Sequence, residues 1–269
     1  MTHEIAGRGL VMLGCGKMGS ALLRGWLQGS IAAQDVWVLD PYAPDWLSEF
    51  PQIHVNADLP PDPAVVLVAV KPQMMQQALP ALAGLGNGRT LFLSVAAGIP
   101  LATYDAMLGA DTPVVRAMPN TPAAIGQGIT AIVGNGPGAA HLDLAAALLS
   151  AVGQVVRLET EAQMDAVTAL SGSGPAYVFY LIEALSAAGI SEGLSPDLAT
   201  RLATATVAGA GALAASSPET AAALREAVTS PAGTTAAGLG VLMDDRSGLS
   251  PLIRATVAAA ADRSRELGG

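Results

Sequence analysis

Three glycines at a characteristic spacing offer the clearest chemistry in this sequence. Gly14, Gly16 and Gly19 follow the apolar run 10–13 and precede a segment expected to form a helix. In such a turn the first glycine makes the bend, the second lets a pyrophosphate approach the backbone, and the third lets helix and strand pack closely. The free N–H groups of the helix start then favour phosphate charge. The pattern predicts a dinucleotide site, although any tight strand-to-helix turn could also produce it.

Asp40 bears on which dinucleotide would bind. It ends the next apolar run, about 20 residues after the last glycine, where an acidic side chain bonds the ribose 2′-hydroxyl. A carboxylate there repels a 2′-phosphate, and the following residues 41–44 contain no arginine. The expected cofactor is NADH or NADPH, with NADH slightly favoured. Asp40 could instead be a capping or surface residue, and Cys15 is expected to be an incidental small residue of the loop.

Charge and residue usage argue against several function classes. The chain has 269 residues, with 13 Lys and Arg against 22 Asp and Glu, and no basic cluster. Nucleic acid and anionic membrane surfaces are therefore not expected partners. Three scattered histidines and one cysteine supply neither a zinc site of ordinary spacing nor a Ser-His-Asp or Cys-His pairing. We expect no metal, and chemistry carried by a cofactor.

Neither a membrane span nor an export signal is expected. Charge-free runs such as 117–140 are interrupted by Pro and Gly, whereas a spanning helix needs about 20 uninterrupted apolar residues. The apolar stretch 10–13 is too short for a signal-peptide core, which needs about 7–15 residues. A single cysteine excludes an intrachain disulfide. These features predict a cytoplasmic protein.

Short apolar runs in the first half predict strands that are buried on both faces. The strong candidates are 10–13, 36–39, 65–70, 91–94 and 114–117, and weaker ones are 129–133 and 155–156. Helices are expected at 20–28 and 74–82. Strands that alternate with helices indicate a mostly parallel, doubly wound sheet.

The pattern changes near residue 159, where the chain becomes Ala-rich. Thr160 and Gln163 have capping-box spacing. Ser-Pro pairs, which favour helix starts, predict helices from about Pro196, Pro218 and Pro251. Further helices are expected from about Asp165 and after the loop 229–235. The predicted fold is α/β plus all-α: a Rossmann-type doubly wound domain, 1–158, and a helical substrate-binding and dimerisation domain, 159–269.

Five further segments carry recognisable motifs. They are Ala-Val-Lys-Pro at 69–72, Ser-Val-Ala-Ala-Gly at 94–98, Arg-Ala-Met-Pro-Asn-Thr-Pro at 116–122, the segment 165–177 with its Ser-Gly-Ser-Gly-Pro, and Val-Thr-Ser-Pro-Ala-Gly-Thr-Thr at 228–235. In this order and spacing, from about residue 10 to 267, the chain resembles the pyrroline-5-carboxylate reductase family. The resemblance implies transfer of a nicotinamide hydride to the C=N carbon of 1-pyrroline-5-carboxylate. The product is L-proline, in the last step of proline biosynthesis.

The resemblance also implies site residues. The cofactor-binding set is Leu13, Gly14, Cys15, Gly16, Lys17, Met18, Gly19, Asp40, Asn56, Ala69, Val70, Lys71, Pro72, Ala96, Ala97, Gly98 and Asn120. The substrate-binding set is Glu161, Ser230, Gly233, Thr234 and Thr235. Thr235, whose hydroxyl would meet the ring nitrogen, and Lys71 are the catalytic candidates. The alternatives are a surface lysine for Lys71, a turn-stabilising role for Asn120, and helix capping for Thr235 and Glu161.

The chain departs from the family pattern at two positions. Ala232 stands where the family often has glycine, and the turn is expected to persist if Ala232 needs no positive φ. Ala227 replaces a polar side chain that some members have, so one substrate contact is expected to be missing or replaced. Alternative functions are an NAD(P)-dependent reductase of another small cyclic imine or β-hydroxyacid, or a non-catalytic dinucleotide sensor. The motifs at 171–177 and 229–235 favour the pyrroline-5-carboxylate reductase prediction over both alternatives.

Two charge-free helical segments predict self-association. Residues 166–182 and 202–217 contain no charged side chain. A helix that is apolar on all sides must be buried on all sides. The 111 residues from Glu159 onward are too few to cover two such helices. We expect a two-fold homodimer with an interdigitated helical core, or a larger ring built from it.

Overall fold

The chain forms two compact units that are described separately. A computed structural model describes residues 2–86 and 88–268. The first unit comprises residues 1–172 together with 261–269, and the second comprises 173–260. The predicted functional division after residue 158 stays a prediction.

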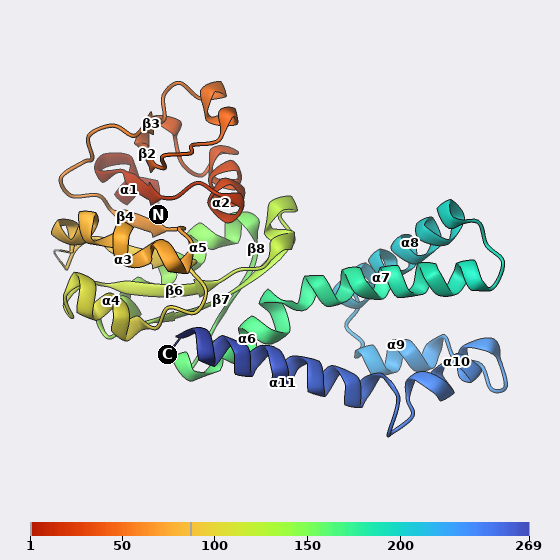
Figure 1. The fold of residues 1–269 in the computed structure, drawn as a ribbon. Coiled ribbons are helices and arrows are strands. Elements are labelled where there is room, and N and C mark those ends of the chain that lie inside the picture. Colours follow the sequence, from red (N-terminus) through yellow and green to blue (C-terminus); the bar gives the residue numbers. More distant parts are fainter. Residues whose placement is uncertain (1, 87, 269) are drawn as a thin grey trace. The chain divides into compact units, whose positions relative to one another are not determined.

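One eight-stranded sheet organises the described residues of the first unit (Figure 1). The strands are β1 (Leu10–Leu13), β2 (Val36–Leu39), β3 (His54–Val55), β4 (Val65–Val68), β5 (Leu91–Ser94), β6 (Val114–Met118), β7 (Gly128–Gly134) and β8 (Gly153–Arg157). Their order is β3-β2-β1-β4-β5-β6-β7-β8. The pairings from β3 through β6 are parallel, β7 runs antiparallel to β6, and β8 is parallel to β7. The predicted mostly parallel sheet is confirmed.

Helices cover both faces of this sheet, which explains why its central strands are continuously apolar. The helices of the unit are α1 (Thr2–Arg8), α2 (Lys17–Leu27), α3 (Met75–Ala78), α4 (Leu101–Leu108), α5 (Leu142–Leu149) and α6 (Met164–Val167). Leu10 and Met12 of β1 share a buried cluster with residues of α2 and α5. Val11 and Leu13 share the opposite cluster with residues of α3 and α4. The period of two along β1 therefore divides its side chains between two cores.

The segment 74–82, predicted to be one helix, is α-helical only in part. The α-helical part, α3, covers four residues and is flanked by the 3₁₀ turns Pro72–Met74 and Leu79–Leu85. Pro80 lacks the N–H that a continuing α-helix would use, and its ring collides with the preceding turn. The predicted strand 65–70 also ends early, at Val68.

The second unit is helical. It contains α7 (Gly174–Ser191), α8 (Pro196–Ser216), α9 (Ala221–Ala227), α10 (Thr234–Leu242) and the first part of α11 (Leu249–Gly268). Helices α7 and α8 form an antiparallel hairpin (Figure 1). The predicted start at Pro196 is confirmed. The predicted start at Pro218 is wrong, because the Thr220 hydroxyl accepts the Ala223 N–H and caps α9 three residues later.

Helix boundaries on either side of this unit also differ from expectation. Helix α11 begins at Leu249, so Pro251 lies in its first turn, where no intrahelical N–H is needed. The helix expected from about Asp165 starts as α6 at Met164 but changes into a π-helical turn, Thr168–Gly172, before α7 begins.

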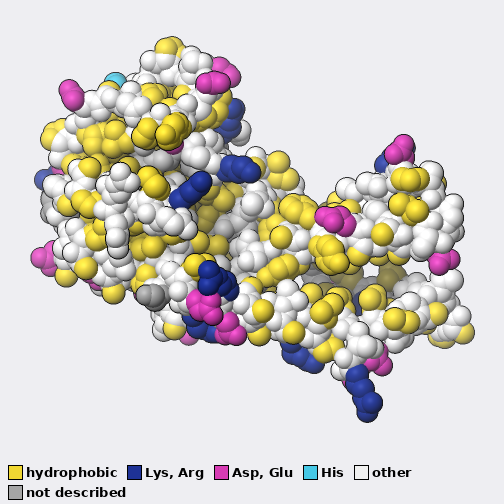
Figure 2. All heavy atoms as spheres, viewed as in Figure 1, with side chains coloured by type: hydrophobic (Ala, Val, Ile, Leu, Met, Phe, Trp, Pro, Cys, Tyr) yellow, Lys and Arg dark blue, Asp and Glu magenta, His cyan; other side chains and the backbone are white. Residues whose placement is uncertain are grey.

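The second unit has very little interior of its own. Among its described residues, those that are buried are small: Ser186, Ala199, Ala203 and Gly248. Large apolar side chains are exposed instead, including Phe179 at 58%, Tyr180 at 71% and Leu252 at 63%. Hydrophobic side chains are visible over its surface in Figure 2. Of the helices described, α8 is long and apolar enough to cross a membrane by length and composition, with 11% of its apolar window buried.

Candidate active site

The three glycines of the turn after β1 meet three different surroundings. Gly14 has φ +93°, and a β-carbon there would lie 2.9 Å from the Ala69 carbonyl oxygen. A β-carbon at Gly19 would lie 2.8 Å from the Gly14 carbonyl oxygen. At Gly16 a β-carbon would meet no described atom within 4 Å. Two of the glycines are therefore required by packing, and the middle one leaves open space beside the backbone.

The start of α2 supplies hydrogen-bond donors to this open space. Gly16 is the N-cap residue, and no side chain caps the helix. The first N–H groups of α2, from Lys17 onward, therefore remain available to an anion. Together with the cradle at Gly16, they fit the pyrophosphate of a dinucleotide.

Asp40 joins the end of β2 to the glycine turn. One carboxylate oxygen, Oδ2, accepts the Cys15 N–H at 2.7 Å, and Oδ1 accepts the Tyr42 N–H at 2.8 Å. A carboxylate offers about four lone-pair sites, so both oxygens keep acceptor capacity for a ribose. The predicted cofactor residues Cys15 and Asp40 are thus in direct contact.

Asn56 lies beside Asp40. Its amide nitrogen donates to the Asp40 carbonyl oxygen at 3.0 Å, and its amide oxygen accepts the Asp40 N–H at 3.0 Å. Asn56 itself has φ +51°, a conformation that asparagine tolerates better than most residues. The structure therefore brings Asn56, predicted to reach the adenosine half of the cofactor, onto the backbone of Asp40.

Cys15 is enclosed beneath the turn. It is 2% exposed, and burial raises the pKa of its thiol. Because a neutral thiol is a poor nucleophile, this environment fits a small packing residue and not a redox centre.

The remaining cofactor candidates follow the carboxyl ends of parallel strands. Ala69, Val70, Lys71 and Pro72 follow β4, the residues Ala96, Ala97 and Gly98 follow β5, and Asn120 follows β6. Since parallel strands end at one edge of a sheet, the structure brings these segments to the same edge as the glycine turn. Lys71 is exposed and makes no ion pair with any residue that the structure describes. The Asn120 side chain accepts the Ile129 N–H at 3.0 Å and so stabilises the turn between β6 and β7.

The Glu161 side chain makes its hydrogen bonds to residues of the first unit. Its Oε1 atom accepts hydrogen bonds from Arg116 Nη1 at 2.7 Å and from the Leu101 N–H at 2.8 Å, at the start of α4. Arg116 is 6% exposed. These contacts match the helix-start alternative, and the substrate contact of Glu161 stays a prediction.

A second polar pair supports the loop after β5. The hydroxyls of Ser94 and Tyr104 lie 2.5 Å apart, and the Ser94 hydroxyl accepts the Ala96 N–H at 3.2 Å. Burial raises the pKa of Tyr104 to about 12, so the phenol stays protonated. Sequence reasoning missed this support and the role of Arg116. The charged Arg116 within an apolar strand was the available signal.

The predicted substrate residues of the second unit gather at one helix start. Gly233 is the N-cap of α10, no side chain caps this helix, and Gly233 N–H donates to the Ser230 carbonyl at 3.1 Å. Thr235 is exposed, and its hydroxyl has no hydrogen-bond partner among the described residues. Ala232 has φ +59°. The turn therefore has a positive φ at this position. The expectation that alanine would keep the turn assumed the opposite, and that assumption is wrong.

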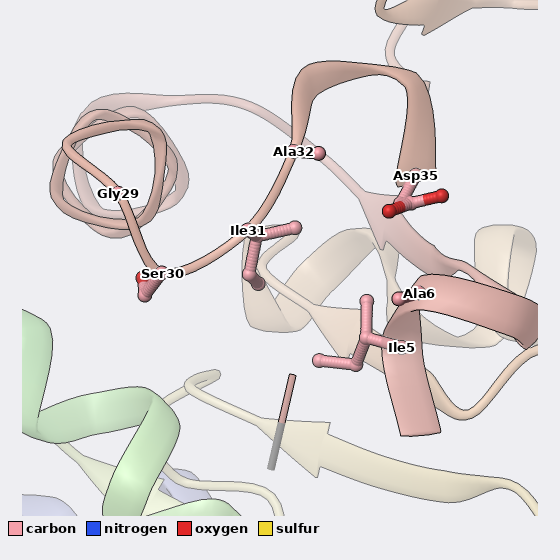
Figure 3. Close-up of a pocket in the computed structure, with 7 residues that line it drawn as sticks. All are labelled: Ile5, Ala6, Gly29, Ser30, Ile31, Ala32 and Asp35. Atoms are coloured by element: carbon pink, nitrogen blue, oxygen red, sulfur yellow. The ribbon is translucent and has the colours of Figure 1, made fainter. Parts of the chain in front are cut away.

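A pocket elsewhere in the first unit is unrelated to these residues (Figure 3). It is lined by Ile5, Ala6, Gly29, Ser30, Ile31, Ala32 and Asp35. Asp35 directly precedes β2, whereas Asp40 directly follows it. This pocket therefore lies toward the amino ends of the parallel strands, opposite the glycine turn. No predicted site residue lines it.

Known proteins resemble the chain over nearly its whole length. It is 41% identical over 264 residues to the pyrroline-5-carboxylate reductase of Pseudomonas aeruginosa, and the match covers 96% of each chain. The chain belongs to the pyrroline-5-carboxylate reductase family. Identity to the family member of Mycobacterium tuberculosis is 39% over 289 residues, again with 96% of each chain covered.

Solved structures of the family share the fold. The pyrroline-5-carboxylate reductase of Coxiella burnetii matches with a TM-score of 0.89 and 31% identity, covering 97% of this chain and 99% of its own. The pyrroline carboxylate reductase of Plasmodium falciparum, solved with NADP bound, matches with a TM-score of 0.83 and 27% identity, over 97% and 98% of the two chains.

Two family models match different parts of the chain. Residues 10–98 match the model described as NADP oxidoreductase, coenzyme F420-dependent. Residues 161–267 match the model described as pyrroline-5-carboxylate reductase dimerisation. This second match includes α7, α8, α9 and α10, whose apolar side chains are exposed in a single copy. Self-association accounts for those exposed faces, including that of α8.

Proposed function

We propose that this protein reduces 1-pyrroline-5-carboxylate to L-proline with NADH or NADPH. The observation that carries the proposal is the 41% identity to a curated pyrroline-5-carboxylate reductase over 96% of the chain. The match includes both the glycine turn and the segment at 228–235. The glycine turn and the uncapped start of α2 also fit the cofactor this reaction requires. We place the enzyme in the cytoplasm.

The two predicted domains divide the work. Residues 1–158 bind the cofactor, which supplies a hydride to the C=N carbon when bound. Residues 159–269 bind the substrate and form the dimer. Because the imine nitrogen can take up its proton before attack, the chain needs neither a strong base nor a metal. Its task is to orient the substrate and to place charge.

The start of α10 holds the substrate. The N–H groups of Thr234 and Thr235 lie at an uncapped helix start, which suits a carboxylate, whereas the Gly233 N–H is already bonded to the Ser230 carbonyl oxygen. Ser230 adds a hydroxyl in the same turn. The Thr235 hydroxyl, which has no partner among the described residues, meets the ring nitrogen and accepts a hydrogen bond from the N–H of the protonated imine.

The sheet edge of the first unit orients the cofactor. The backbones of 69–72 and 96–98 line it, and Asn120 lies near the nicotinamide. Lys71 adds an exposed positive charge at these strand ends, which attracts the anionic cofactor and the substrate carboxylate. Glu161 is the substrate-side acid of the proposal.

Asp40 sets a preference for NADH. Its carboxylate is held at the end of β2 by two backbone N–H groups. A negative charge fixed there attracts a ribose 2′-hydroxyl and repels a 2′-phosphate.

A substrate panel tests the proposal. Purified enzyme is mixed with NADH or NADPH and with pyrroline-5-carboxylate or six-membered cyclic imines, and separately with NAD⁺ or NADP⁺ and β-hydroxyacids. Cofactor oxidation in the first assays and cofactor reduction in the second are followed by absorbance. We expect the highest kcat/KM for pyrroline-5-carboxylate. Faster turnover of a six-membered imine or a hydroxyacid would favour the alternative reductase, and cofactor binding without turnover would favour a sensor.

A further inference from the structure

Asn56 fixes the main chain of Asp40 from both sides. Its side-chain amide bonds the Asp40 N–H and the Asp40 carbonyl oxygen, each at 3.0 Å. The Asn56 N–H also donates to the Val38 carbonyl oxygen at 2.8 Å, which attaches Asn56 itself to β2. The side chain of this exposed residue, whose backbone lies in the left-handed region, thus bonds one neighbour through both its amide oxygen and its amide nitrogen.

This arrangement determines where the Asp40 carboxylate can point. From the fixed backbone, Oδ2 reaches the Cys15 N–H at 2.7 Å and Oδ1 reaches the Tyr42 N–H at 2.8 Å. The carboxylate is therefore held against the glycine turn. If the backbone of Asp40 were free to move, the side chain could rotate into solvent, where its charge would be screened.

The surrounding charge gives this orientation a consequence. Residues 41–58 contain Asp45, Glu49 and Asp58 but neither lysine nor arginine. The basic side chain that the structure records against this segment is Arg24 of α2, whose guanidinium is stacked 4.0 Å from the centroid of the Trp46 ring. A 2′-phosphate would thus meet a fixed carboxylate with no basic side chain supplied by residues 41–58, whereas a 2′-hydroxyl could donate to that carboxylate.

We propose that Asn56 is a positioning residue for cofactor choice: it holds Asp40 so that the chain discriminates against a 2′-phosphate. This inference rests on the proposed NADH preference of Asp40. Asn56 acts through the backbone of Asp40 and needs no contact of its own with the cofactor.

Replacement of Asn56 by glycine provides the test. Glycine adopts φ +51° without strain, so Asn56→Gly removes the amide and keeps the backbone conformation. Calorimetric titration of the enzyme with NAD⁺ and with NADP⁺ gives the ratio of the two Kd values. We expect this ratio to move about tenfold toward NADP⁺, because two hydrogen bonds that hold the carboxylate are lost. In the cofactor-free protein, the Cys15 and Tyr42 amides should exchange faster with deuterium.

Two comparisons make the outcome specific. Asn135→Ala removes a similar side-chain link elsewhere in the sheet, where the Asn135 amide accepts the Val114 N–H and donates to the Thr112 carbonyl. It should lower stability and leave the Kd ratio unchanged. Asp40→Ser tests the proposal on which the inference rests, and should move the ratio at least as far as Asn56→Gly.

The possible failures are distinguishable. If Asp40→Ser moves the ratio and Asn56→Gly does not, or if Asn56→Gly weakens both cofactors equally, the positioning role is overturned while the NADH preference stands. If Asp40→Ser leaves the ratio unchanged, the NADH preference fails and the inference fails with it.

Discussion

Arg116 Nη1 and Glu161 Oε1 lie 2.7 Å apart, and the same oxygen accepts the Leu101 N–H at 2.8 Å. One carboxylate thus neutralises a buried guanidinium of β6 and stabilises the positive end of α4. The loop 96–98, whose backbone is predicted to line the cofactor, lies between β5 and α4. The contact of Glu161 with the Leu101 N–H therefore fixes the end of this loop at which α4 begins. The pair links the stability of the first unit to the shape of its site.

Removal of this carboxylate should destabilise the protein. Glu161→Ala leaves the Arg116 charge, 8% exposed as a side chain, without its partner. Breaking a fully buried pair costs about 3–5 kcal/mol, and because Glu161 is itself 30% exposed we expect about 2–4 kcal/mol. Urea unfolding at fixed protein concentration measures the change. The control is Glu266→Gln in the exposed pair with Arg263, which should change stability by less than about 1 kcal/mol. Equal losses in the two variants would contradict the buried-pair interpretation.

The turn before α10 stores strain that glycine would relieve. Ala232 has φ +59°, where a side chain is unfavourable. Ala232→Gly should raise the free energy of unfolding by about 0.5–1 kcal/mol, since the relief of strain exceeds the added flexibility of the unfolded chain. The matched control is Ala208→Gly within α8, which should lower it by about 1 kcal/mol. A loss of stability in both variants would mean that the turn is unstrained.

The Thr235 hydroxyl should matter to turnover and not to folding. Thr235→Ala removes a hydroxyl that lacks any partner among the described residues, so stability should change little. Loss of one positioned hydrogen bond should lower kcat by roughly 10- to 1000-fold. Thr235→Ser keeps the hydroxyl and should retain most of the activity. Thr256→Ala, which removes a hydroxyl bonded to the Leu252 carbonyl in α11, serves as the control. An unchanged kcat in folded Thr235→Ala enzyme would remove Thr235 from the mechanism.

Asp40 should control the kinetic preference between cofactors. Asp40→Ser removes the fixed negative charge. A second variant, which combines Asp40→Ser with Ala43→Arg, also adds a positive charge. The KM for NADPH should fall more than the KM for NADH, and the second variant should extend the trend. Steady-state kinetics with both cofactors measures this. A wild-type enzyme that prefers NADPH by tenfold or more would refute the electrostatic argument.

Local sequence signals predicted the frame of the fold well. Each predicted strand is present, because a short apolar run flanked by turns has few alternatives once both faces of a sheet are covered. The Ser195-Pro196 start of α8 is equally local, since proline at the first helical position loses no hydrogen bond. Where two local signals competed, as Thr220 did with Pro218, the side chain that could bond a free N–H determined the boundary.

Contacts between distant segments could not be predicted in this way. Glu161 reaches Arg116 and Leu101 only because β6 and α4 meet beside the chain that follows β8. Asn56 reaches Asp40 because β3 pairs with β2. The motif resemblance named both Glu161 and Asn56 but gave neither their partners nor the positive φ of Ala232, which depends on how the turn closes.

The helical unit should depend on a second copy for its stability. Its described buried residues are Ser186, Ala199, Ala203 and Gly248, too small a core to fold alone, while Tyr180 and Leu213 are exposed at 71% and 55%. The match of 161–267 to a dimerisation family model agrees with this need. Unfolding temperature should therefore rise with protein concentration, since association stabilises the folded chain by mass action. Replacing Leu213, on the apolar surface of α8, by Glu should lower the association constant, whereas Asp197→Glu at the charged start of the same helix should not. Light scattering across nanomolar to micromolar protein measures the assembly, and a compact, active monomer over that range would contradict this account.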